Sequence, residues 1–204
     1  MRHWRGACAL AVACVAVFAL AGCTTQPALP APIQHQMDYA QTYWNHYNTK
    51  VYGNLNDDGG DCANFVSQTL VARGWKMNAQ WYDHDAAADW SPAWGYVPSM
   101  YDYFEDNEKQ LGLTPYSLTQ LTHITDGDVA MFDWGDGTWD HAMVVTNVVD
   151  TTVNGKTQVQ VYLTGHNKND RNKSLATILK EYPQATGVFW HIALPPTASP
   201  TPST

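Results

Sequence analysis

The chain of 204 residues has 11 Lys and Arg against 19 Asp and Glu, a formal net charge of −8 at pH 7. This acidic balance argues against a nucleic-acid partner, because binding to phosphates needs the opposite charge. The length suits one well-buried domain, expected over residues 33–194, rather than two. The sequence has no Gly-rich phosphate loop and no CxxC pair, so we expect neither a cofactor nor a cysteine metal site.

The first residues have the pattern of an export signal. Arg2 and Arg5 precede an apolar run, Ala7 to Ala21, that is shorter than the roughly 20 residues needed to cross a bilayer. A signal peptide is therefore predicted over residues 1–22. Its removal leaves 9 basic against 19 acidic residues, a formal charge near −10.

A lipid anchor is predicted where the apolar run ends. The sequence Leu20-Ala21-Gly22-Cys23 resembles a bacterial lipobox, at which the cysteine is acylated; cleavage by an ordinary signal peptidase is the alternative. Acylation of Cys23 would hold the protein on a bacterial membrane outside the cytoplasm, with residues 23–32 as a tether. Residues 195–204, rich in Pro, Thr and Ser, are expected to be disordered.

The domain is expected to begin with helical structure. The apolar spacing predicts an amphipathic helix over residues 36–52, with an aromatic stripe that faces the core. Residues 54–59 then resemble the start of a calcium loop, but Phe65 occupies the position where such a loop needs Glu. We therefore expect a polar turn, with a calcium site as the alternative. The aromatic stripe of the helix predicted over residues 36–52 consists of Ala40, Tyr43, Trp44, Tyr47 and Val51.

Cys62 is the candidate nucleophile. It follows Gly59-Gly60-Asp61, with Asp61 at the expected N-cap, so it lies in the first turn of a helix that should end near Arg73-Gly74. The free N–H groups and dipole of a helix N-terminus favour the reactive thiolate. A small buried structural cysteine is the alternative reading. With Cys8 and Cys14 in the removed segment and Cys23 acylated, Cys62 would be the only free thiol of an exported protein.

Residues 75–97 are rich in tryptophan and lack a clear period, so a long loop is predicted. Trp81, Trp90 and Trp94, together with Asp61, are candidates for lining a substrate groove, and some of the rings could instead fill gaps in the core. A helix is expected over residues 98–110, with Met100, Tyr101 and Phe104 turned inward.

The second half of the domain is expected to be a sheet. Strands are predicted at residues 128–132, 141–145 and 158–163, with Asn154-Gly155 as a two-residue hairpin turn. This turn pairs Val153 with Lys156 and places His166 opposite Met143, on the same face as His141, while Asn167 points to the other face. We expect the Cys62 helix to lie against the face with the two histidines.

Several blocks of the sequence resemble the putative amidase domain family of bacterial exported proteins. That family is similar to the papain-like cysteine amidases and peptidases, including NlpC-type and CHAP enzymes that cut cell-wall peptides. The resemblance covers most of residues 38–180, and Ala63 departs from the small hydroxyl residue usual at its position. The blocks are Tyr39-Ala40 with Tyr43-Trp44 and Tyr47-Asn48, Asp61 to Gln68, Gly127-Asp128-Val129, Asp140 to Val145, and Gly165-His166 with Asn167.

The resemblance implies a papain-like α+β fold, in which N-terminal helices, one of them carrying the cysteine, pack on an antiparallel sheet that carries the histidines. It implies Cys62 as the nucleophile, His141 as general base and acid, and His166 as the group that orients the imidazole, with Asn167 as the alternative third residue. The expected protein is a monomeric, lipid-anchored cysteine amidase or peptidase acting on peptidoglycan peptides. The alternative is a lipoprotein that binds wall glycan or peptide on the same fold without catalysis.

Overall fold

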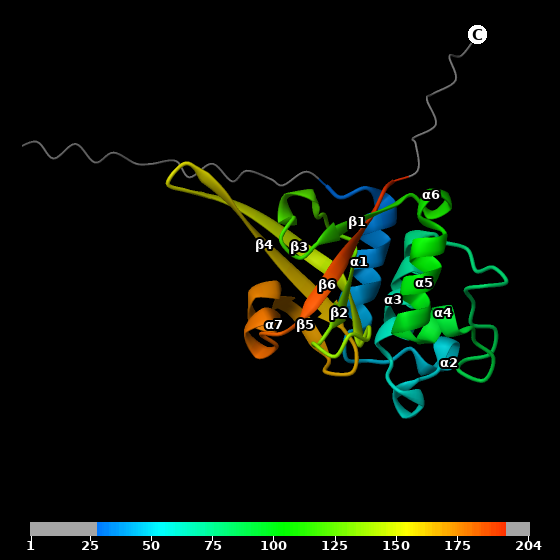
Figure 1. The fold of residues 1–204 in the computed structure, drawn as a ribbon. Coiled ribbons are helices and arrows are strands. Elements are labelled where there is room, and N and C mark those ends of the chain that lie inside the picture. The colour runs from blue at the N-terminus through cyan, green and yellow to red at the C-terminus, as the bar shows by residue number, and fades with distance from the viewer. Residues whose placement is uncertain (1–27, 195–204) are drawn as a thin grey trace, which may run out of the picture.

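The computed structural model describes residues 28–194, and the predicted signal peptide, the lipidation site and the C-terminal tail lie outside these residues. The described chain forms an N-terminal group of helices followed by a sheet (Figure 1). The helices are α1 (Ala31–Tyr43), α2 (Thr49–Tyr52), α3 (Cys62–Arg73), α4 (Pro92–Gly95), α5 (Val97–Asp106), α6 (Glu108–Leu111) and α7 (Leu175–Glu181). The strands are β1 (Leu113–Ser117), β2 (Val129–Asp133), β3 (His141–Val153), β4 (Lys156–Gly165), β5 (Asp170–Ser174) and β6 (Thr186–Ile192).

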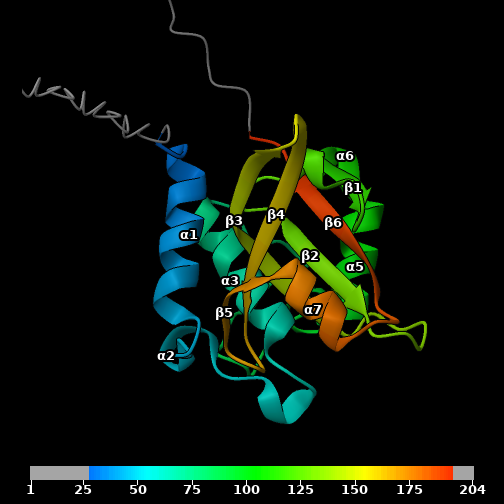
Figure 2. The same cartoon turned by 90° about the vertical axis from the view of Figure 1, so that its left-hand side faces the viewer.

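The six strands form one antiparallel sheet in the order β1-β6-β2-β3-β4-β5. Figure 2 shows α7 on one side of this sheet and α1 and α3 on the other. The sheet therefore has two buried faces, and the expected α+β class is confirmed. None of the helices within residues 28–194 is long and apolar enough to cross a membrane.

Each face of the sheet packs in its own hydrophobic cluster. On the side of α1, α3 and α5, Ala142 and Val144 of β3 pack with Val66 and Leu70 of α3. On the side of α7, the alternate residue Met143 of β3 packs in a second cluster that includes Ile178 of α7 and the strand residues Val145 and Leu163. This alternation along β3 decides to which side each site residue points.

The first helix differs from the prediction at both ends. It begins at Ala31, inside the predicted tether, with a proline in its first turn, and it ends at Tyr43 instead of continuing to residue 52. The carbonyl of Tyr43, which a continuing helix would pair with the Tyr47 N–H, faces the ring of His166 instead. The predicted aromatic stripe is therefore broken, and Val51 is 53% exposed.

The prediction for the cysteine helix is confirmed, since α3 starts at Cys62 and ends at Arg73. Gly74 has a φ of 111° and its N–H bonds to the carbonyls of Leu70 and Val71, as expected of a glycine C-cap. The predicted strands and the Asn154-Gly155 turn are also present, with Val153 paired to Lys156. The helix expected over residues 98–110 is divided into α5 and α6 at Asn107, and the segments β1, β5, α7 and β6 were not predicted.

The predicted register between β3 and β4 holds only near the turn. An irregularity between Val145 and Asn147 shifts the pairing by one residue, so that Val144 pairs with Thr164. A shift of one residue changes which face a side chain occupies. The prediction that His141 and His166 share a face is therefore wrong: His141 pairs with Phe132 on the α7 side, whereas His166 packs against Phe65 of α3.

Candidate active site

Cys62 is the first residue of α3, and only 3% of it is exposed. Backbone N–H groups of Ala142, Ala63 and Cys62 itself lie near the thiol group and act to lower its pKa. Burial nevertheless raises the pKa of Cys62 to about 11, because loss of solvation outweighs these donors. The expectation that the helix N-terminus favours a thiolate is wrong for this closed arrangement: at neutral pH the group is a thiol.

Asp61 connects the start of α3 to the sheet. Its Oδ2 atom lies 2.5 Å from Nδ1 of His166, and its Oδ1 atom accepts hydrogen bonds from the backbone N–H of Leu55 at 2.7 Å and from Nδ2 of Asn64 at 2.8 Å. The carboxylate is fully buried and makes no side-chain capping bond to the helix. The interpretations of Asp61 as a cap and as a groove residue are therefore both wrong, because its oxygens hold neighbouring parts of the chain.

His166 is part of the same internal network. Its Nδ1 atom faces Asp61 and its Nε2 atom lies 2.7 Å from the carbonyl oxygen of Tyr43. Both partners are oxygen atoms, so each ring nitrogen has a polar partner within the protein. The ring is also stacked between Tyr47 and Phe65, with centroids 3.9 and 4.1 Å away. With both nitrogens engaged, His166 does not orient His141 in this structure.

Asn167, the alternative third residue of the predicted catalytic group, lies between the segment before Cys62 and a small cavity. Its Oδ1 atom accepts the backbone N–H of Asp61 at 2.6 Å, and its side chain lines the same cavity as His141. A Cβ atom at Gly60, where φ is 128°, would lie 2.5 Å from Nδ2 of Asn167. Because Gly60 has no side chain, Asn167 can approach the segment before Cys62 closely.

His141 is the first residue of β3 and is 7% exposed. Burial, together with the smaller effect of the charges of Lys168 and Lys173, lowers the pKa of its ring to about 4, so the ring is neutral at pH 7. The sulfur of Cys62 lies near the backbone N–H of Ala142, the next residue along β3. Within residues 28–194 no hydrogen bond joins that sulfur to the ring of His141, which faces the α7 side.

The cavity beside His141 has a volume of about 220 Å³. It combines titratable side chains with aromatic and apolar ones, as ligand sites do. The side chains that line it are Trp134, Asp140, His141, Met143, Asn167, Lys168, Asp170, Lys173, Ile178 and Tyr182.

A family model described as a putative amidase domain matches residues 33–190, which is most of the chain. The chain belongs to this amidase domain family. Membership indicates amide hydrolysis as the general activity. No curated protein and no solved structure matches the chain.

Two of the three tryptophans predicted to line a groove belong to the core of this amidase domain. Trp81 and Trp94 are fully buried, and their ring N–H groups donate to Oγ of Ser67 at 3.0 Å and to Oδ1 of Asn64 at 2.8 Å. Trp90 is partly buried and packs against the same core. The groove prediction is wrong for Trp81 and Trp94, because the loop folds back and covers α3 with their rings.

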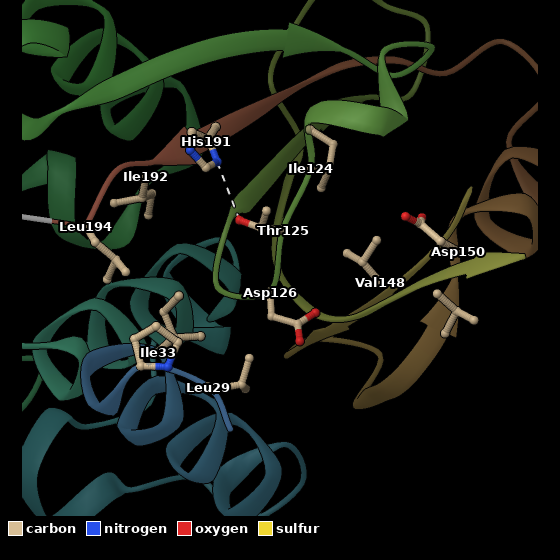
Figure 3. A pocket seen from close by; sticks show the side chains of 12 residues that line it. Leu29, Ile33, Ile124, Thr125, Asp126, Val148, Asp150, His191, Ile192 and Leu194 are labelled. Atoms are coloured by element: carbon tan, nitrogen blue, oxygen red, sulfur yellow. Dashed lines mark hydrogen bonds between the residues drawn. The ribbon is translucent and has the colours of Figure 1, made fainter. Parts of the chain in front are cut away.

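A larger cavity of about 740 Å³ lies away from the cysteine. Figure 3 shows its walls, with Ile33 of α1 and Ile124 around the carboxylate of Asp126 and with His191 near its rim. Its lining on β3 begins at Val148, roughly 23 Å further along the strand than His141 at the usual rise per residue. None of the predicted site residues lines this cavity, so it is not the candidate active site of the amidase domain.

Residues 54–59, which partly resemble a calcium loop, form the expected polar turn. Asn56–Asp58 form a short 3-10 turn, and Oδ1 of Asn54 accepts the N–H of Asn56. Within the described part of the chain, only Asp133, Asp136 and Asp140 bring three potential ligands within 4.8 Å of one another. Three backbone N–H groups of that turn already bond to Asp133, so these acids are explained by the turn itself.

Three residues that line the pocket beside His141 were not predicted from the sequence: Trp134, Lys168 and Tyr182. Lys168 follows directly on His166-Asn167, and this adjacency was the one available signal. Trp134 and Tyr182 come from separate segments whose rings stack with centroids 4.1 Å apart. Only the packing of α7 on the sheet brings them together.

Proposed function

We propose that this chain is an exported cysteine amidase or peptidase, anchored through a lipid on Cys23, that hydrolyses amide bonds in peptidoglycan peptides. Cys62 is the nucleophile and His141 is the general base and acid. The fold is proposed to be related to the papain-like amidases. Amide hydrolysis follows from the family, and the cysteine mechanism, the anchor and the substrate are our additions.

The surroundings of the Cys62 sulfur carry this proposal. The sulfur lies at a helix start, near backbone N–H groups of α3 and near the N–H of Ala142 on β3, the residue that follows a neutral histidine. Backbone N–H groups at a reacting centre can also stabilise the oxyanion of an amide intermediate, and we assign the Cys62 N–H to this role. Catalytic hydrogen bonds are often long or misaligned before the substrate binds, which is consistent with the missing bond between Cys62 and His141.

The protonation states define the mechanism. With a pKa of about 11 for Cys62 and about 4 for His141, both groups are neutral at pH 7. The imidazole therefore takes the thiol proton as sulfur attacks the amide carbon, and returns it to the nitrogen when the C–N bond breaks. Water, deprotonated by the same imidazole, then cleaves the thioester and restores the thiol.

Two structural features refine this mechanism. Asn167 is the better candidate for the third polar residue, because it lines the pocket with His141 whereas both nitrogens of His166 have other partners. Because Cys62 is only 3% exposed, the substrate reaches the sulfur only when neighbouring side chains move. We assign this movement to residues 167–169, which are exposed and contact Asp61 through the side chain of Asn167.

The experiment is hydrolysis of purified wall fragments, with products identified by mass spectrometry. We expect Cys62→Ala and His141→Ala to abolish product formation while the melting temperature of Cys62→Ala stays near that of the wild type. Hydrolysis that persists in Cys62→Ala would overturn the cysteine mechanism. Binding of fragments without any product from the wild type would favour the non-catalytic alternative. Loss of membrane association in Cys23→Ala tests the anchor separately.

A further inference from the structure

Lys168 places an unpaired positive charge in the pocket of His141. Its Nζ atom hydrogen-bonds to the hydroxyl of Tyr182 and lies 4.6 Å from the centroid of that ring. All 19 acidic residues of the chain fall within residues 28–194, and none of them lies within salt-bridge distance of Lys168. The charge of Lys168 is therefore available to a ligand.

The other charged groups of the pocket are already engaged. Lys173 is paired with Asp170 at 3.4 Å and with Glu181 at 2.7 Å. Oδ2 of Asp140 accepts the backbone N–H of Trp134 at 2.8 Å. Lys168 is thus the one lysine or arginine lining this pocket that lacks an acidic partner within the described residues.

Basic and acidic side chains are equal in number in this pocket, although acidic residues outnumber basic ones in the chain as a whole. Two of the nine basic residues in positions 28–194 line this single small cavity. Both lysines act on the candidate base, since their charges contribute to the lowered pKa of His141. A group bound at Lys168 therefore lies close enough to His141 to be part of the same substrate.

We propose that Lys168 binds a carboxylate of the substrate, so that the amidase acts on amides with an acidic group near the scissile bond. This assignment of a substrate class rests on the proposed function. The Tyr182 oxygen accepts from Lys168, which leaves the hydroxyl hydrogen free to donate to the second carboxylate oxygen. The stacked rings of Trp134 and Tyr182 and the side chains of Met143 and Ile178 provide apolar surface for the rest of the ligand.

The carboxylate could be the C-terminus of a peptide or an acidic side chain, and matched substrates separate the two sources. One pair of peptides differs only in a C-terminal carboxylate or carboxamide, and a second pair differs only in Glu or Gln beside the scissile bond. The enzyme variants are Lys168→Met, Lys168→Arg and the control Lys180→Met. Lys180 is an exposed lysine of α7 outside the pocket, so its loss changes the net charge equally.

For one of the two carboxylate substrates, we expect Lys168→Met to lower kcat/KM by roughly 3- to 10-fold, the range of a partly solvated ion pair. The kcat/KM of Lys168→Met for the uncharged partner substrate should equal that of the wild type. Lys168→Arg should retain most of the wild-type kcat/KM for the carboxylate substrate, and Lys180→Met should change kcat/KM for neither substrate of the pair. An equal effect on both members of each pair, or no effect on either, would overturn the assignment.

Binding to Cys62→Ala distinguishes failure of this inference from failure of the proposed function. Calorimetry with the same peptides should show tighter binding of the carboxylate form, and this preference should vanish in Cys62→Ala/Lys168→Met. If the wild type hydrolyses nothing but this preference is observed, the proposed catalysis fails and the carboxylate site stands. If Cys62-dependent hydrolysis is indifferent to the carboxylate and to Lys168, the catalytic proposal stands and this inference is wrong.

Discussion

Asp61 offers the most direct test of how the cysteine helix is held. Its buried carboxylate accepts hydrogen bonds from the Leu55 N–H at 2.7 Å, from Nδ2 of Asn64 at 2.8 Å and from His166, whose Nδ1 lies 2.5 Å away. In Asp61→Ala all three donors lose their acceptor. In Asp61→Asn one oxygen remains for Leu55 and Asn64, and only the partner of His166 changes from an acceptor to an amide.

The expected cost follows from these contacts. A buried donor left unpaired costs about 1–3 kcal/mol, and the simple sum for three donors is an upper bound because water enters the space. Breaking one side of a buried charged pair costs about 3–5 kcal/mol. We therefore expect Asp61→Ala to lower the free energy of unfolding by about 4 kcal/mol and Asp61→Asn by about 2 kcal/mol.

Urea titration of the whole chain, followed by circular dichroism, measures this difference. In thermal unfolding, about 4 kcal/mol corresponds to a fall in Tm of roughly 8–16 °C for a domain of this size. Asp58→Ala is the control, because Asp58 is exposed in the preceding turn and its loss should change stability by at most about 0.5 kcal/mol. If Asp61→Ala remained within about 1 kcal/mol of the wild type, the carboxylate would not be the connection that holds α3 to the sheet.

Three further outcomes are expected. Burial lowers the pKa of His141 to about 4, so the unfolded chain binds a proton near pH 6.5 before the folded domain does. The free energy of unfolding of the wild type should therefore fall as the pH is lowered from 6.5 to 4, by up to about 3 kcal/mol more than that of His141→Gln. An equal pH dependence of the two proteins would refute this. Because burial raises the pKa of Cys62 to about 11, alkylation by iodoacetamide at pH 7 should be slower than for a model thiol and still increase above pH 9. A rate that levels off near pH 7 would contradict that pKa. Trp81→Phe removes a buried ring N–H bond to Ser67 and should lower stability by about 2 kcal/mol without changing substrate affinity. A raised Kd with unchanged stability would restore Trp81 as a groove residue.

Features with strong local signals were predicted correctly from the sequence. The helix that begins at Cys62 and ends before Gly74 depends on a glycine that adopts a positive φ at its C-terminus, and Asn154-Gly155 forms its hairpin turn for a similar reason. These signals involve residues that are neighbours in the chain. The α+β class and the amidase family followed from such segments and from the order of the sequence blocks.

The tertiary structure decided the roles of the individual side chains. Asp61 has the sequence context of an N-cap, but the position of His166 draws its carboxylate away from the helix. The sequence around Trp81 does not distinguish a ring that contacts substrate from a ring in the core. The folding of the loop over α3 buries this ring.

One irregularity in β3, between Val145 and Asn147, had the largest effect on the site. Alternation along a strand predicts faces only while the pairing stays in register, and the sequence around the irregularity contains no glycine or proline that would mark it. The sequence therefore determined which residues are available for chemistry, namely Cys62, His141 and His166. The packing of helices on both faces of the sheet determined that His166 supports the start of α3, while His141 shares a pocket with Lys168.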